Sequence, residues 1–180
     1  MPGSETNIIP GQKFSGKLLD LHLSNKKPIR IGTIDIGTNS THLLIASLDP
    51  ILNTFSIDLA EKSTTRLGER DQDSGNLTSL AMNRVFETLK RFKELALSYK
   101  VESLSIAATS AVREAPNGKK FLFEIKENID LDVDLISGPE EARLIYLGVL
   151  SGMQLGKKPH FVLDIGGGST ELILADGEVA

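Results

Sequence analysis

The sequence predicts an α/β fold with a mixed five-stranded sheet and helices, followed by the first hairpin of a second unit. Three observations lead to this prediction. Two short patterns, DIGTNS at residues 35–40 and DIGGGS at residues 164–169, each lie between two apolar runs, as the turn of a hairpin does. An amphipathic segment spans residues 77–99. After it, apolar strands alternate with helical segments, which is typical of a sheet whose later strands are parallel.

The composition fits a globular chain and excludes several kinds of chemistry. With 180 residues, 40% hydrophobic and 24% charged, the chain can form one full domain with residues left over. The net charge of −4 argues against a dedicated nucleic-acid binder. The absence of cysteine excludes disulfides and a Cys-based zinc site. No apolar run has the ~20 residues of a membrane span, and no secretory signal pattern is found, so we expect a cytoplasmic protein without a membrane partner.

The predicted elements begin after a leader. Residues 1–28 have weak periodicity and are predicted to be mostly flexible, although residues 18–23 could form an amphipathic turn or a docking segment. The segments 29–34, 43–46 and 53–60 are predicted as three antiparallel strands in a meander. The charged, turn-rich segment 66–76 is predicted as a loop, and residues 77–99 as a helix.

The second half of the chain continues with alternating elements. Strands are predicted at 104–108 and 133–136, with a helix at 119–128 between them. Ser137 and Glu140 have the spacing of a capping box, which predicts a helix from there through Leu150. Glycines 152 and 156 end this helix before a hairpin with strands at 161–163 and 172–175. This order is that of one ribonuclease-H-like lobe, residues 29–158, and the start of a second lobe, residues 159–180.

The two hairpin turns are predicted to bind phosphate. Glycines let the backbone turn tightly and aim successive N–H groups at an anion, and hydroxyl groups add donors. The predicted phosphate contacts from these turns are Gly37, Thr38, Asn39, Ser40, Gly166, Gly167, Gly168, Ser169 and Thr170. Asp35 and Asp164 end the first strand of each hairpin, where they could hold a cation or a water beside the anion. The alternative is that each Asp bonds the backbone of its own turn.

Element order and the two turns together resemble the actin-like superfamily of sugar kinases, chaperone ATPases and related phosphotransferases. Three blocks give a narrower resemblance: TSAVREA at residues 109–115, ISGPEEARL at 136–144 and DIGGGSTE at 164–171. In this order and spacing they resemble the signature blocks of the exopolyphosphatase and guanosine pentaphosphate phosphohydrolase (Ppx/GppA) family. The resemblance covers roughly residues 29–175 and is weakest from 61 to 76.

The resemblance implies a phosphatase that hydrolyses phosphoanhydride bonds in inorganic polyphosphate or guanosine pentaphosphate and releases orthophosphate. It places Glu141 at the catalytic carboxylate, as the general base for the attacking water. The alternative is a Glu that merely complements the dipole of its helix. Glu171 would be a second carboxylate that shares the metal or the water, or else an exposed polar position that opens a strand.

Mg²⁺ or another divalent cation is expected on Asp35, Asp164 and Glu141, with waters and substrate phosphates completing its coordination. Arg113 follows a predicted parallel strand and is expected to bind phosphate; the alternative is a surface pair with Glu114 or Glu87.

Four other side chains near these motifs receive no catalytic role. Arg66 could be a weaker phosphate contact on its loop but is better explained as a solvated charge. His42 could act as an acid but is better explained as a packed or hydrogen-bonded side chain. No histidine is predicted as a metal ligand. For Arg143 we expect a structural ion pair, and for Glu140 a capping contact with Ser137.

Family members continue after the second phosphate turn with the rest of the second lobe. We therefore expect this chain to be part of a longer protein and to be inactive or nearly so by itself. Its second hairpin should pack back on the first lobe or pair with another chain, so a homodimer is possible. Two rival functions remain open: an ATP-dependent kinase or ATPase of the superfamily, and a non-catalytic phosphate-binding fragment.

Overall fold

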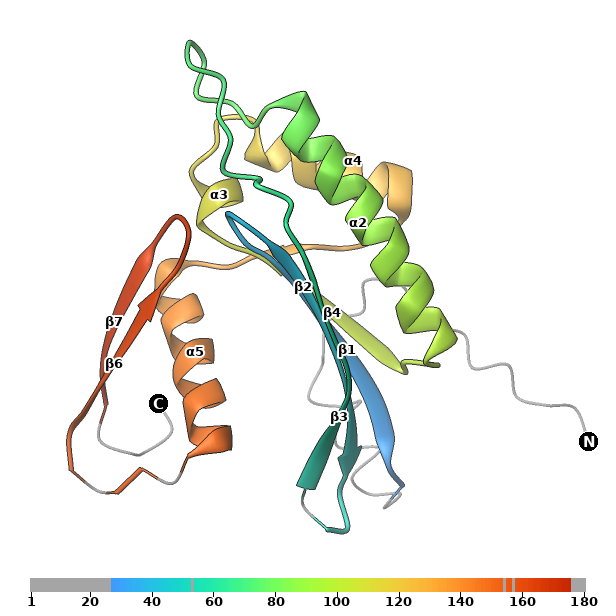
Figure 1. The fold of residues 1–180 in the computed structure, drawn as a ribbon, viewed down its shortest axis with the longest axis vertical. Coiled ribbons are helices and arrows are strands. Elements are labelled where there is room, and N and C mark those ends of the chain that lie inside the picture. Colours follow the sequence, from blue (N-terminus) through green and yellow to red (C-terminus); the bar gives the residue numbers. More distant parts are fainter. Residues whose placement is uncertain (1–26, 53, 154, 157, 176–180) are drawn as a thin grey trace, which may run out of the picture.

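The predicted five-stranded mixed sheet is confirmed in the computed structural model, which describes residues 27–52, 54–153, 155–156 and 158–175. Strands β1 (Ile29–Ile36), β2 (Thr41–Asp49) and β3 (Thr54–Ser63) form an antiparallel meander. Strand β4 (Ser103–Ala108) pairs with β1 in parallel, and β5 (Asp134–Leu135) pairs with β4 in parallel. The strand order is β3-β2-β1-β4-β5 (Figure 1). Residues 1–26 of the predicted leader lie outside the described residues.

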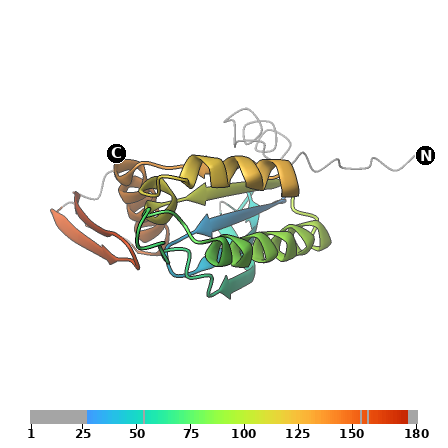
Figure 2. The same cartoon turned by 90° about the horizontal axis from the view of Figure 1, so that it is seen from above.

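Two helices cover one face of this sheet. Helices α2 (Ser79–Ser98) and α4 (Gly118–Ile129) lie side by side (Figures 1 and 2), and the rings of Phe86 and Phe121 meet edge to face with centroids 5.4 Å apart. The core between the helices and the sheet contains Ile34, Ile36, Leu43, Ile45, Val85, Leu89, Phe92, Ile106, Phe121 and Ile125. The predicted helix at 77–99 thus forms because its apolar stripe faces the sheet.

The opposite face of the sheet carries polar side chains near the first turn. Because side chains alternate along a strand, Asp35 points away from the helix-covered face to which Ile34 and Ile36 belong. Asp35 lies directly opposite His42 on β2, and His42 lies directly opposite Lys62 on β3. Three titratable groups therefore form one row across three strands.

The start of helix α5 (Gly138–Gly152) follows the sequence prediction only in part. The Ser137 hydroxyl accepts a hydrogen bond from the Glu140 N–H at 3.3 Å, as predicted for the cap. The reciprocal half of the capping box, however, is not formed. The Glu140 carboxylate instead makes two hydrogen bonds of 2.8 Å with the Arg143 guanidinium, because a bidentate charged pair is stronger than a bond to a neutral amide. The structural ion pair expected for Arg143 is confirmed.

Other boundaries differ from the sequence prediction. A four-residue helix, α3 (Ser110–Arg113), follows β4 and was not predicted, since so short a segment has no helical periodicity. The strands beside both turns extend to the turn residues, because ladder pairing continues beyond the apolar runs. In contrast, the strand predicted at 133–136 has only two paired residues. Among the described residues, no helix is both long and apolar enough to cross a membrane.

The second hairpin forms its own two-stranded sheet from β6 (His160–Ile165) and β7 (Thr170–Ala175). Strand β7 packs against α5, so the hairpin packs back on the preceding lobe, the first of the two predicted alternatives. Its turn lies beside the turn between β1 and β2 (Figure 1). The other face of the hairpin exposes five large apolar side chains: Phe161, Leu163, Ile165, Leu172 and Leu174.

Candidate active site

The two hairpin turns have the same backbone geometry. The Gly37 N–H donates to the Ser40 carbonyl at 3.1 Å, and the Gly166 N–H donates to the Ser169 carbonyl at 3.0 Å. The flanking registers also correspond, since Asp35 pairs with His42 and Asp164 pairs with Glu171. One strand–turn–strand unit therefore occurs twice, with an Asp at the same place in each copy.

Both turns present backbone N–H groups that have no acceptor among the described residues. These are the amides of residues 38–40 and of residues 167–169. In the first turn the carbonyls are occupied: Gly68 donates to Thr38 at 2.9 Å, while Thr65 and Arg66 donate to Asn39 at 3.1 and 2.9 Å. In a trans peptide the N–H points opposite to the carbonyl, so the Asn39 and Ser40 amides point away from residues 65–68. Successive unpaired amides of this kind bind anions.

The glycines of the second turn allow it to contact the first. A Cβ atom at Gly167 would lie 2.5 Å from the Asn39 side-chain nitrogen, and one at Gly168 would overlap the Thr38 hydroxyl. The Thr38 hydroxyl is itself 3.1 Å from the Ser110 hydroxyl. Only glycine permits this close approach. The triple glycine therefore brings the two hairpin turns together around one cavity of about 180 Å³.

Four carboxylates from four elements line this cavity. They are Asp35 on β1, Glu141 on α5, Asp164 on β6 and Glu171 on β7. The turn residues 37–40 and 166–169 complete most of the wall. The structure therefore brings together nearly all of the predicted site residues. The exceptions are Thr170, which is exposed, and Arg113, neither of which lines the cavity.

Three cavity residues were not assigned from the sequence. Thr109 and Ser110 lie directly after the C-terminal end of β4, the edge at which α/β sheets bind ligands, so strand position could have identified them. His42 also lines the cavity, and its Nε2 lies 2.8 Å from the Ser40 hydroxyl. The hydrogen-bonded state expected for His42 is confirmed, but its place in the site is not obvious from a single His in a strand.

The carboxylates of the cavity influence one another. Burial raises the pKa of Asp35; the positive charge of His42 opposes this rise and the negative charge of Asp164 adds to it. Burial likewise raises the pKa of Glu141, while the hydrogen bond from Arg113 lowers it and the charge of Glu171 raises it. A cavity with this much negative charge favours ligands that bring compensating positive charge.

Arg113 holds Glu141 in place. Its Nη1 donates to the Ile136 carbonyl at 2.9 Å and to the Glu141 carboxylate at 3.2 Å. The Glu141 side chain is 15% exposed. Arg113 thus ties α3 to the start of α5 and pairs with Glu141, not with Glu114 or Glu87. Its Nε and Nη2 donate to no acceptor among the described residues, so a phosphate contact by Arg113 stays a prediction.

The donor set fits Mg²⁺ shared with a substrate. In the described part of the chain, no group of three or more acidic or histidine side chains is arranged to hold a metal by itself. Mg²⁺, however, is commonly bound by one or two carboxylates together with waters and substrate phosphates. Asp35 and Asp164 offer hard oxygen donors whose mutual repulsion a dication would relieve. With Glu141, they line the same cavity as the unpaired amides.

Comparisons with known proteins show the family to which the chain belongs. The model of the Ppx/GppA phosphatase family matches residues 44–180. The crystal structure of an Aquifex aeolicus member of the Ppx/GppA family is 33% identical, with a TM-score of 0.75 over 84% of this chain and 48% of that one. An exopolyphosphatase from Cytophaga hutchinsonii is 36% identical, with a TM-score of 0.77 over 82% of this chain and 47% of that one. The chain spans about half the length of these structures.

Proposed function

Because this chain belongs to the Ppx/GppA phosphatase family, we propose that it forms part of the active site of a phosphatase that hydrolyses phosphoanhydride bonds. The proposed substrates are inorganic polyphosphate and the 5′ end of guanosine pentaphosphate, with orthophosphate as the product. Support for polyphosphate comes from the similar Cytophaga hutchinsonii protein, which is an exopolyphosphatase.

The proposal rests on one observation: two turns with unpaired amides and the partly buried carboxylate of Glu141 line the same small cavity. The amides suit the oxygens of a terminal phosphoryl group, which gain negative charge during transfer. A general base works best when its pKa lies near the operating pH, and burial moves the pKa of Glu141 in that direction.

In the proposed reaction, the amides of both turns bind the terminal phosphoryl group. Glu141 accepts the proton of a water molecule as the water oxygen attacks phosphorus, and the bond from phosphorus to the bridging oxygen breaks. Glu171 accepts a second hydrogen bond from this water, and Arg113 keeps Glu141 oriented. A bound Mg²⁺ would supply positive charge that offsets the charge on the phosphate oxygens.

The test measures the release of phosphate from polyphosphate, guanosine pentaphosphate and ATP by the full-length protein that the gene encodes. We expect release from one or both of the first two substrates. Glu141→Gln should reduce turnover by about 10²- to 10⁴-fold and retain substrate binding, because it removes the base but keeps the shape of the side chain.

Glu140→Gln is the matched control, since Glu140 precedes Glu141 but pairs with Arg143 instead of lining the cavity. It should retain turnover. Hydrolysis of ATP alone would contradict the proposed substrates and favour the kinase or ATPase alternative. Unchanged turnover in the Glu141→Gln protein would remove Glu141 from the mechanism.

A further inference from the structure

The two strand–turn–strand units of the cavity differ in one chemically important residue. Each unit has an Asp, a Ser that ends its turn, and a third polar residue on the strand after that turn. All three line the cavity in both units: Asp35, Ser40 and His42 in the first, and Asp164, Ser169 and Glu171 in the second. A histidine in the first unit thus stands where the second has a carboxylate. The proposed hydrolysis uses Glu171 and gives His42 no role.

The imidazole of His42 contacts the hydroxyl group of the first turn. Its Nε2 lies 2.8 Å from the Ser40 oxygen. The contact follows from the sequence, because alternate residues of an extended chain face the same side and Ser40 and His42 are such a pair. The Ser169 hydroxyl of the second turn has no hydrogen-bond partner in the described part of the chain. Only the first turn therefore places a basic nitrogen on its serine.

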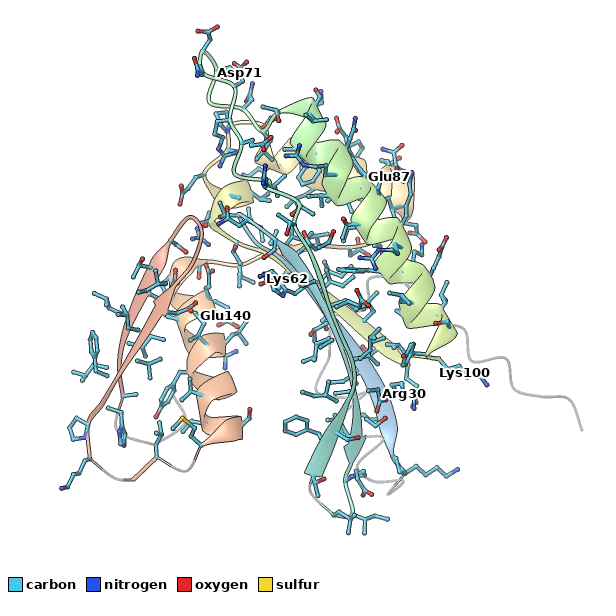
Figure 3. The ribbon with its side chains drawn as sticks, viewed as in Figure 1. Arg30, Lys62, Asp71, Glu87, Lys100 and Glu140 are labelled. Atoms are coloured by element: carbon cyan, nitrogen blue, oxygen red, sulfur yellow. The ribbon has the colours of Figure 1, made fainter. Side chains whose placement is uncertain are left out.

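The sheet register adds a carboxylate to this pair. Asp35 lies directly opposite His42 on β1, and Lys62 is the next residue of their row. Figure 3 shows Lys62 extending from β3 on the side of the sheet that faces the β6–β7 hairpin, so the row lies on the side where the second turn closes the cavity. Carboxylate, imidazole and hydroxyl in this sequence are the groups of an activated serine nucleophile.

The Ser40 hydroxyl also lies where the proposed substrate would bind. The amide of Ser40 is one of the unpaired N–H groups of residues 38–40, to which the terminal phosphoryl group is assigned. Because the amide and the hydroxyl belong to one residue that lines the cavity, a phosphoryl group bound by the amide lies beside the hydroxyl. A nucleophile needs both this proximity and a neighbouring base, and Ser40 has both.

We infer that Ser40 is a second acceptor for the terminal phosphoryl group, besides water, and that the protein phosphorylates itself there. The inference rests on the proposed function, which supplies the phosphoanhydride donor. The Ser40 oxygen forms a bond to phosphorus while the bond from phosphorus to the bridging oxygen breaks. The hydroxyl proton passes to His42 Nε2, and the shortened substrate leaves with the electron pair of the broken bond.

Water removes the phosphoryl group from Ser40 again. Glu141 lines the same cavity, so it accepts the proton of a water molecule that attacks the phosphoserine. The bond from phosphorus to the Ser40 oxygen breaks, and this oxygen regains its proton from His42. Phosphoserine therefore accumulates only when the attack of water is slow. Glu141→Gln slows this step and is the variant in which the phosphoserine should be found.

The test incubates the full-length Glu141→Gln protein with linear polyphosphate or with guanosine pentaphosphate. Mass spectrometry of the intact protein and of its peptides should show one added phosphoryl group, located at Ser40. In the same background, Ser40→Ala should remove this group and Ser40→Thr should retain it as phosphothreonine. His42→Gln keeps a polar side chain that accepts no proton, so it should slow phosphorylation by about 10²- to 10⁴-fold.

Ser169→Ala is the matched control, because it removes the hydroxyl at the corresponding place of the second turn. This protein should still be phosphorylated at Ser40. Urea unfolding midpoints show whether a variant remains folded, and the phosphothreonine of Ser40→Thr identifies the acceptor even if Ser40→Ala unfolds. No added phosphoryl group, a group on another residue, or an equal rate in the His42→Gln protein would overturn the inference.

The result also separates this inference from the proposed function. Phosphate release by the original protein without phosphorylation of Ser40 in the Glu141→Gln protein would overturn the inference and leave the proposed function in place. Phosphorylation of Ser40 by polyphosphate, without phosphate release by the original protein, would contradict the proposed function and leave Ser40 as the acceptor.

Discussion

The pair Arg113 and Glu141 determines the charge state of the proposed base. Two opposing effects act on the Glu141 carboxylate: burial raises its pKa, and the Arg113 hydrogen bond lowers it. The pKa of Glu141 is raised overall, because the effect of burial is larger than that of the Arg113 hydrogen bond. A base must be ionised to accept a proton. The activity should therefore fall on the acid side at a pH above the usual range of a glutamate.

Removing the Arg113 guanidinium should shift the acid limb of the pH profile, where activity falls as pH decreases, to a higher pH. In Arg113→Gln, burial and the charges of Glu171 and Asp35 remain while the opposing hydrogen bond is lost, so the pKa of Glu141 rises. The measurement is kcat/KM against pH, which reports ionisations of the free enzyme. Arg143→Gln is the control, because Arg143 pairs with Glu140 outside the cavity. An acid limb that stays in place, or moves to lower pH, would contradict the assignment of Glu141 as the titrating base.

At the scale of elements, helix α2 supports the sheet edge at which the site lies. Its residues Val85, Leu89 and Phe92 are fully buried against the strands. The helix begins at Thr78, whose hydroxyl accepts a hydrogen bond from the Ala81 N–H at 3.2 Å, and its first turn has no acidic residue. The threonine cap is therefore the side-chain contribution that stabilises the start of this helix.

Thr78→Ala should lower the free energy of unfolding by about 1 kcal/mol, because the N-terminal amides of α2 lose their side-chain acceptor. The midpoint of urea unfolding gives this value. Thr78→Ser keeps the hydroxyl and should unfold close to the original midpoint. If the alanine and serine variants have the same urea midpoint, well below that of the original chain, the lost methyl group and not the cap is responsible.

At the scale of the whole molecule, the two turns of the site belong to sheets of different size and burial. The first turn belongs to a five-stranded sheet with two helices packed on it. The second turn belongs to a two-stranded sheet whose one face packs on α5 and whose other face is exposed. Small sheets open more easily than large buried ones.

Amide hydrogen exchange should therefore be faster in residues 160–175 than in β1 and β4. Mass spectrometry of peptides from these segments measures the difference. Addition of polyphosphate should slow exchange at residues 38–40 and 167–169 in particular, because their free amides would then donate to phosphate. Equal protection of both sheets in the unliganded chain would contradict the unequal stability, and unchanged exchange in the turns would contradict their role in binding.

Much of this arrangement could be predicted from local sequence. The two DIG turns, the long helix and the alternation of later elements each depend on a few neighbouring residues. Glycines predict the turns because they allow a tight backbone, and the spacing of apolar residues predicts the helices and strands. The resemblance to the signature blocks of the family predicted Glu141 as the general base. The short helix α3 and the missing half of the capping box were not predictable in this way, because they depend on the packing after β4 and on the competing partner Arg143.

The sequence by itself determined the family, the two glycine-containing turns and the residues that could carry the chemistry. The tertiary structure decided which of these residues meet. From the sequence Arg113 could bind a phosphate or pair with Glu114 or Glu87, whereas in the structure it donates hydrogen bonds to the Ile136 carbonyl and to the Glu141 carboxylate at the start of α5. Lys62 and Arg66 look like ordinary surface charges along the chain. They become the wall of a second cavity only because sheet register and three backbone hydrogen bonds to the first turn place them there, and neither contact is local in sequence.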